Sequence, residues 1–245
     1  MEVPHVKIII NKDADSTMLL HRMDDGFFFR NKNLLKEISG LSTEEAKRKI
    51  SEFIDRFYAE NANLLESRRE DIQSAWDIVN DKVMLRLSKM MQTSWYDTDI
   101  TGVLSLNPIC PRNLKESSFF ISYFYDTKKT NGIILHEITH FLFFKKWKEV
   151  FKDYDEKEFD TPHLIWNLSE IVVEPIDEDS ELQTVVPERA TAYKKYHKII
   201  VPGRDIDLVE YFRRLYSENA SSGGDFAQFL VRAKNEINKL SSLFS

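Results

Sequence analysis

The chain has 245 residues and a formal net charge of −6, with 42% hydrophobic and 30% charged residues. This composition is typical of a folded globular protein that is long enough to bury a substantial core. The negative net charge and the absence of a basic stripe argue against nucleic-acid binding. No apolar stretch approaches the about 20 residues that cross a membrane. We therefore expect neither a nucleic-acid partner nor a membrane partner.

Cysteine usage and the N-terminal residues indicate a compartment. A single cysteine, Cys110, excludes an intrachain disulfide and suits the reducing cytoplasm. The first residues show neither the positive region nor the long apolar run of a secretory signal. The sequence thus predicts a cytoplasmic protein, and it leaves the oligomeric state open.

The first half of the chain combines predicted strands with a helical region. A helix is expected to follow Ser42, because Ser42 and Glu45 have the spacing of a capping box. Prolines on both sides of Ile109 and Cys110 exclude a central strand there. In chain order, the sequence predicts strands over His5–Ile10 and Gly26–Phe29, two helices within residues 42–92, and strands over Gly102–Leu106 and Ser118–Phe124.

The second half of the chain is predicted to be largely helical. The pattern predicts a helix from Asp126 or Thr127 to about Trp147, a helix from Thr161 to Glu174 that Pro175 stops, an acidic surface loop over residues 176–181, a helix that Pro187 opens, and two C-terminal helices. We therefore expect an α+β fold with an N-terminal subdomain, residues 1–150, and a helical C-terminal subdomain, residues 151–245.

The strongest chemical signal is the sequence His136-Glu137-Ile138-Thr139-His140 inside the first of these later helices. Two histidines four residues apart on a helix differ by only about 40° around its axis, so both imidazoles face the same way. They can hold one zinc ion, and Glu137 between them can reach a water molecule bound to it. The motif therefore indicates a zinc-dependent hydrolase, and a peptidase in particular.

Two histidines leave a catalytic zinc site incomplete, because a third protein ligand is needed and the fourth position is kept for water. Glu170 is the preferred candidate, since it lies within an otherwise apolar helix where an unpaired carboxylate is costly. Glu174 follows one turn later on the same face and can orient a ligating histidine. The other candidates for the third ligand are His163, Glu174 and His197, and a merely amphipathic helix remains an alternative for the two acids.

The pattern of His136, Glu137 and His140 followed by Glu170 and Glu174 resembles that of the gluzincin metallopeptidases, the clan of thermolysin-like enzymes. The resemblance covers roughly residues 100 to 200. It implies that Glu170 is the third zinc ligand and that Glu174 orients a histidine. The chain departs from the pattern in having Glu rather than the commoner Asp at position 174, and in a longer spacing after His140 than in thermolysin.

The resemblance also implies a zincin-like fold, in which a small, twisted, mostly antiparallel sheet packs on the motif helix. The edge strand of such a sheet binds the substrate, because an extended peptide can pair with an exposed strand. In this chain the residues expected to do so are Gly102, Val103, Leu104, Ser105, Leu106 and Asn107.

The mechanism expected of such an enzyme assigns a role to each candidate. Zinc polarises the water and the scissile carbonyl, while Glu137 moves the proton of the water to the leaving amine. A donor that stabilises the tetrahedral oxyanion is also needed. His197 is the first choice for that donor, followed by Tyr193 and Tyr196. The sequence is at least as consistent with His197 being an ordinary surface histidine that has no such role.

Three alternatives remain open on the sequence alone. The chain can be a zinc-stabilised binding protein whose site is closed by a fourth ligand such as His163 or Cys110. It can be a latent peptidase in which the Cys110 thiolate covers the metal, although an inert buried cysteine is the more common case. It can also be a helical structural protein in which the motif is accidental.

Overall fold

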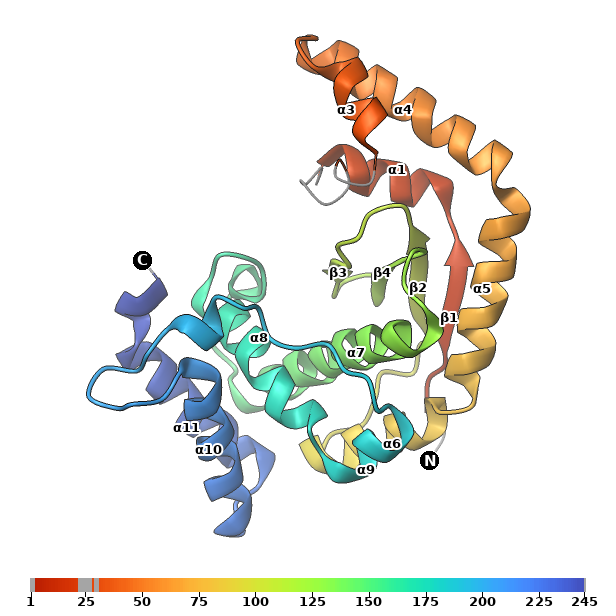
Figure 1. Ribbon diagram of the computed structural model, residues 1–245. Helices are drawn as coiled ribbons and strands as arrows, with labels where there is room; N and C mark the ends of the chain where they lie inside the picture. Colours follow the sequence, from red (N-terminus) through yellow and green to blue (C-terminus); the bar gives the residue numbers. More distant parts are fainter. Residues whose placement is uncertain (1–2, 22–27, 29–30, 245) are drawn as a thin grey trace. The chain divides into compact units, whose positions relative to one another are not determined.

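The computed structural model of the protein describes residues 3–21, 28 and 31–244. The strands are β1 (Val6–Ile10), β2 (Ile100–Ser105), β3 (Arg112–Asn113) and β4 (Ser118–Ser122) (Figure 1). The helices are α1 (Lys12–His21), α3 (Lys32–Ile38), α4 (Thr43–Glu60), α5 (Ala62–Asp77), α6 (Asn80–Met91), α7 (Thr127–Val150), α8 (Leu164–Asp177), α9 (Ser180–Val185), α10 (Leu208–Ser221) and α11 (Phe226–Lys239). The predicted α+β class is confirmed.

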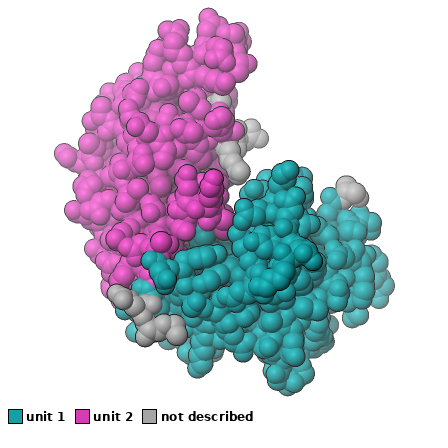
Figure 2. Space-filling view, turned by 180° about the vertical axis from the view of Figure 1, so that it is seen from behind, with its two compact units in different colours: residues 1–3, 81–97, 135–245 teal, residues 4–80, 98–134 magenta. Residues whose placement is uncertain are grey.

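The chain folds into two compact units, which Figure 2 colours separately. Residues 4–80 and 98–134 form the sheet unit, and residues 1–3, 81–97 and 135–245 form the helical unit. The units interleave along the chain, and α7 begins in the sheet unit and continues into the helical unit. Among the described residues, no helix is both long and apolar enough to span a membrane.

The sheet of the sheet unit has the strand order β1-β2-β4-β3. Strand β2 pairs in parallel with β1 on one side and with β4 on the other, and only β3 and β4 are antiparallel. The sheet is therefore mixed, and the predicted mostly antiparallel sheet is wrong. Local patterns locate strands but do not say which ones pair, and here Val6 pairs with Ile100 from a distant part of the chain.

Because β2 has neighbours on both sides, it has no free edge to which a peptide can add, and the prediction of an edge strand at residues 102–107 is wrong. Gly102 serves packing instead, since a Cβ atom there would lie 2.8 Å from Ile8 Cδ1 and 2.9 Å from Ile121 Cδ1. Gly102, Val103, Leu104, Ser105, Leu106 and Asn107 thus lose the basis for their predicted role in substrate binding.

Two helices of the sheet unit, α1 and α5, contact this sheet. Helix α5 packs beside β1 (Figure 1), and α4 contacts both α1 and α3. The capping box predicted at the start of α4 is confirmed: the backbone N–H of Glu45 donates to Ser42 Oγ, and that of Ser42 donates to the Glu45 carboxylate. Of the predicted strand 26–29, only Phe28 lies within the described residues, and it is helical.

A buried carboxylate, Asp15, joins α1 to the end of β2. It is fully excluded from solvent. Its Oδ2 accepts hydrogen bonds from the backbone N–H of Leu106 at 3.0 Å and the hydroxyl of Tyr58 at 2.8 Å, and its Oδ1 accepts one from Ser105 Oγ. Burial raises the pKa of Asp15, while these three hydrogen bonds oppose that rise. The polar groups at the end of β2, the Ser105 hydroxyl and the backbone N–H of Leu106, thus form hydrogen bonds inside the protein.

Helix α8 lies in the helical unit, where it contacts α10 and α11 (Figure 1). It runs through Pro175 to Asp177, so the predicted stop at Pro175 is wrong. A proline inside a helix costs one hydrogen bond, but the fully buried neighbours Val173 and Ile176 favour continuing the helix into the core. Residues 176–181 therefore form the end of α8 and the start of α9 rather than a surface loop.

The helix predicted to open at Pro187 is also absent, because residues 186–195 are not helical. One 3₁₀ turn over Tyr196–Lys198 follows. The apolar and aromatic residues of this segment pack against α8 rather than along a helix of their own, as the contacts of Ala192 and Tyr196 with α8 show.

Replacing Asp15 by Ala should lower the free energy of unfolding by about 3 kcal/mol, because buried partners that lose their acceptor cost about 1 to 3 kcal/mol each. Urea denaturation of the purified protein measures this change. The matched control is Asp13→Ala on the exposed side of α1, which should change stability by less than about 0.5 kcal/mol. Equal effects of the two substitutions would contradict the role of Asp15.

Candidate metal centre

Helix α7 presents the two histidines of the motif from a buried position. Around them the helix is apolar on every side, and Leu135, Ile138 and Leu142 are fully buried. His140 is fully buried and His136 is 8% exposed. Four residues make slightly more than one helical turn, so the two rings lie one above the other, with centroids 4.7 Å apart.

Helix α8 carries a stripe of four buried polar residues. Asn167, Glu170, Glu174 and Asp177 follow one another at spacings of three, four and three residues, which place them on one face of a helix. Each is at most 8% exposed. Buried polar groups at such a density need partners, and the partners of this stripe define the site.

Glu170 meets the two histidines. His140 Nε2 lies 3.1 Å from His136 Nε2, Glu170 Oε2 lies 3.6 Å from His136 Nε2, and Glu170 Oε1 lies 3.5 Å from His140 Nε2. All three ligand atoms are thus close enough to bind one metal ion. The predicted ligands His136, His140 and Glu170 are thus brought together from two helices.

The charges around this cluster favour a cation. Burial lowers the pKa of His136, but the hydrogen bond with Glu170 and the charges of Glu137, Glu170 and Asp177 outweigh it and raise that pKa above its ordinary value. The carboxylates therefore stabilise positive charge at this point of the helical unit, whether a proton or a metal ion carries it.

Asp177 completes the stripe at the end of α8. Its Oδ1 accepts a hydrogen bond of 2.8 Å from the hydroxyl of Thr139, which lies beside His140 in the motif. Its Oδ2 and the outer nitrogen of His136, Nδ1, are both buried and lack a hydrogen-bond partner among the described residues. Burial raises the pKa of Asp177 to about 7, and the charge of His136 opposes that rise. Asp177 therefore acts on His136 through its charge rather than through a hydrogen bond.

Asp177 is a site residue that the sequence analysis missed, because it was placed in a surface loop beyond Pro175. The spacing of Asn167, Glu170, Glu174 and Asp177 was the signal that could have found it. Pro175 hides that signal, because a proline is expected to end a helix.

Glu174, which follows Glu170 by one turn in the stripe, contacts His197. His197 Nε2 lies 3.1 Å from Glu174 Oε2, which also accepts a hydrogen bond of 2.8 Å from the backbone N–H of Ala192. Glu174 Oε1 accepts one of 2.8 Å from Arg213 Nη2 on α10. Glu174 thus orients His197, and its predicted role toward a ligating histidine stays a prediction.

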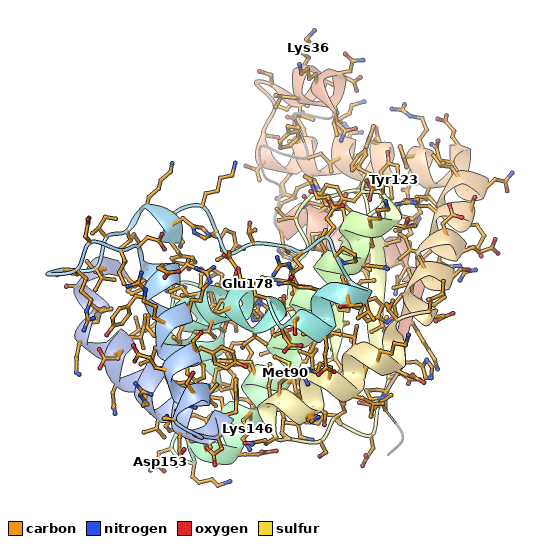
Figure 3. The ribbon with its side chains drawn as sticks, turned by 60° about the horizontal axis from the view of Figure 1, so that its bottom comes forward. Lys36, Met90, Tyr123, Lys146, Asp153 and Glu178 are labelled. Atoms are coloured by element: carbon orange, nitrogen blue, oxygen red, sulfur yellow. The ribbon has the colours of Figure 1, made fainter. Side chains whose placement is uncertain are left out.

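Arg213 joins Glu174 to the residue that follows the end of α8. It also binds Glu178, the residue after α8 that is labelled in Figure 3, and Glu210 on its own helix. The hydrogen bond with Glu178 and the other carboxylates raise the pKa of Arg213, although burial opposes this. The guanidinium therefore stays charged and holds Glu174 in place.

The other predicted candidates lie outside the cluster. His163 is exposed at the N-terminal end of α8, and Cys110 belongs to the sheet unit. Among the described residues, the group of histidine, cysteine and carboxylate side chains that could hold an ion contains only His136, His140 and Glu170. The described residues thus supply three protein ligands rather than the four of a closed site.

Comparisons with known proteins add no relative. No protein-family model matches the chain, and no curated protein or solved structure matches it significantly. What can be said of the site therefore rests on its own geometry.

Glu170→Gln should bring the metal content of the purified protein well below one ion per chain, since a neutral amide is a poor ligand beside two imidazoles. Elemental analysis after dialysis measures it, and circular dichroism shows whether the fold is kept. The matched control is Glu188→Gln, an exposed acid of the same unit, which should retain the metal of the unmodified protein. Unchanged metal content in Glu170→Gln would rule out this ligand.

Asp177→Asn should weaken metal binding by about 10-fold to 100-fold, because it removes a buried negative charge that acts on the ligating His136. Competition with a chromogenic chelator measures the dissociation constant. Thr139→Val, which removes the hydroxyl that holds Asp177, should act in the same direction. Asp153→Asn changes an exposed acid of the same unit and should have no effect. An affinity that stays unchanged in Asp177→Asn would exclude the role.

Proposed function

We propose that the protein is a zinc-dependent peptidase that uses His136, His140 and Glu170 as metal ligands. The observation that carries this proposal is the spacing of the ligand atoms. The two Nε2 atoms lie 3.1 Å apart, and the Glu170 oxygens Oε2 and Oε1 lie 3.6 Å from His136 Nε2 and 3.5 Å from His140 Nε2, respectively. A tetrahedral zinc ion with bonds of about 2.0 to 2.1 Å requires ligand atoms about 3.3 Å apart. Two imidazoles and one carboxylate are also the donor set of known catalytic zinc sites.

In this proposal Glu137 is the general base. It follows His136 directly in α7, and its charge acts on that imidazole. A bound zinc ion supplies Lewis-acid polarisation of the water and of the scissile carbonyl. Glu137 takes a proton from the water as its oxygen attacks the carbonyl carbon, and it delivers that proton to the amine as the C–N bond breaks.

His197 supplies the donor for the tetrahedral oxyanion. Glu174, which orients it, lies one turn after Glu170 on the same face of α8. His197 is therefore held beside the helical turn that follows the metal ligand Glu170. Glu174 in turn is fixed by Arg213 and by the backbone of Ala192. A donor that is held in place by such partners stabilises developing charge without reorganising.

The finer assignments form part of the same proposal. The sequence resemblance to gluzincins supports a place in that clan with a zincin-like fold, and the lone cysteine supports a cytoplasmic location. Residues 102–107 are not included as a substrate site, because β2 has no free edge.

A second candidate is a zinc-stabilised or latent regulatory protein without proteolytic activity. It is favoured by the low exposure of the site, since Glu137 is 6% exposed and Glu170 is 3% exposed. A peptidase must admit both water and a peptide to these groups.

Glu137→Gln should keep zinc bound and lower the turnover of a peptide library by about 10²-fold to 10⁴-fold, the range expected for loss of a general base. Mass spectrometry of the digest and elemental analysis measure the two effects. Chelation of the unmodified enzyme should abolish cleavage, and added zinc should restore it. Undiminished cleavage by Glu137→Gln would overturn the role of Glu137, and stoichiometric zinc without any cleavage in the unmodified chain would favour the second candidate.

A further inference from the structure

The segment that follows α9 has an unusual charge for this protein. Between residues 189 and 204 there is no acidic residue, while the chain as a whole has a net charge of −6. We call residues 189–204 the basic strap. Its cationic residues are Arg189, Lys194, Lys195, Lys198 and Arg204.

The basic strap lies along the face of α8 that carries the metal ligand. Near the C-terminal end of α8, the backbone N–H of Ala192 donates to Glu174. Near the N-terminal end, the hydroxyl of Tyr196 donates to Asn167 Oδ1 at 2.6 Å. Glu170 lies between Asn167 and Glu174 in α8. Within the helical unit, the strap therefore passes beside the turn of α8 that carries Glu170.

Aromatic rings fix the middle of the basic strap. The ammonium of Lys195 lies 4.7 Å from the ring centroid of Tyr196, 5.6 Å from that of Trp166 and 5.9 Å from that of Tyr193. Trp166 is on α8, one turn before Glu170. These cation–π contacts hold the positive charge beside the metal-bearing helix.

The lysines of the basic strap are not neutralised. Lys194, Lys195 and Lys198 are exposed, and none of them forms an ion pair with a carboxylate of the described residues. Other cations of the helical unit are paired, as with Lys148 and Glu156 or Arg214 and Glu210, and what distinguishes the strap is that its lysines lie within a segment of 16 residues without any acid. A run of unpaired cations attracts and orients an anionic partner.

We propose that the basic strap binds acidic residues of the substrate, so that the protein acts on acidic peptide segments. This inference rests on the proposed peptidase function, because it places the strap beside the cleaved bond. An acidic peptide is favoured over a nucleic acid because the strap is one short segment in a chain of net charge −6, whereas nucleic-acid surfaces are broadly basic.

The test measures binding without turnover, in the full-length Glu137→Gln chain loaded with zinc. The probes are a fluorescein-labelled peptide of alternating Ala and Glu residues and its counterpart with Gln in place of Glu. Fluorescence anisotropy should show about tenfold tighter binding of the Glu peptide, equivalent to a few exposed charge pairs. The preference should disappear when salt is raised from about 50 mM to about 500 mM.

The variant Lys194→Gln/Lys195→Gln/Lys198→Gln should lose this preference. Its matched control, Lys82→Gln/Lys89→Gln/Lys152→Gln, makes the same charge change at exposed lysines of α6 and of the loop after α7, and it should keep the preference. Trp166 gives a second readout, because it is half-buried while Trp76, Trp95 and Trp147 are buried. Binding of an unlabelled Glu peptide should change its fluorescence, and the strap variant should lose that change.

Three outcomes would overturn the proposal: equal binding of the Glu and Gln peptides, an equal loss in the control variant, or tighter binding of an oligothymidylate than of the Glu peptide. Cleavage of the peptide library by the unmodified enzyme is measured separately. Cleavage without a preference for acidic peptides would reject the strap alone, whereas acidic binding without any cleavage would reject the peptidase function alone.

Discussion

The helical unit depends on the contact between the motif histidines of α7 and the polar stripe of α8. His136, His140 and Glu170 are buried together, and three ionisable groups in such surroundings are stable only when they interact closely. Each group has an atom within 3.6 Å of an atom of each of the other two, so each compensates part of the desolvation of the others. A metal ion at this point would replace repulsion between the two imidazoles by attraction to a shared cation.

The same stripe also organises its surroundings. Asp177 binds Thr139 and so joins the end of α8 to α7, while Glu174 binds Arg213 and so joins α8 to α10. Because both acids lie on one face of α8, a shift of this helix would disturb the ligand, the carboxylate beside His136 and the support of His197 together. The ligand Glu170 is therefore followed on its face of α8 by two carboxylates that other helices hold, as a preorganised catalytic or binding centre requires.

The segment after α9 shows how a loop can acquire a role through its contacts. The cations of residues 189–204 are interleaved with apolar and aromatic residues, so they form no basic stripe in the sequence. In the folded protein Ala192 and Tyr196 hold the segment against α8, which places these cations beside that helix. His197 and Lys195 are both held to residues of α8, through Glu174 and Trp166 respectively.

The sequence by itself determined the elements whose signals are local. The spacing of His136 and His140 places both rings on one side of a helix whatever the rest of the chain does, and Glu170 was selected because its neighbours are apolar. The capping box at Ser42 and the α+β class are of the same kind, since they depend on residues a few positions apart. These predictions rest on helical and strand periodicity, which the nearest neighbours in sequence enforce.

Only the tertiary structure decided the features that depend on distant partners. The pairing of β1 with β2 turned a predicted edge strand into a central one, and the burial of Ile176 and Asp177 carried α8 through Pro175. Asp177 joined α8 for that reason, and the fold brought Glu174 to His197 and Arg213. The physical reason is common to all of them: burial and pairing energies between remote segments exceed the local preference of a proline or a strand pattern.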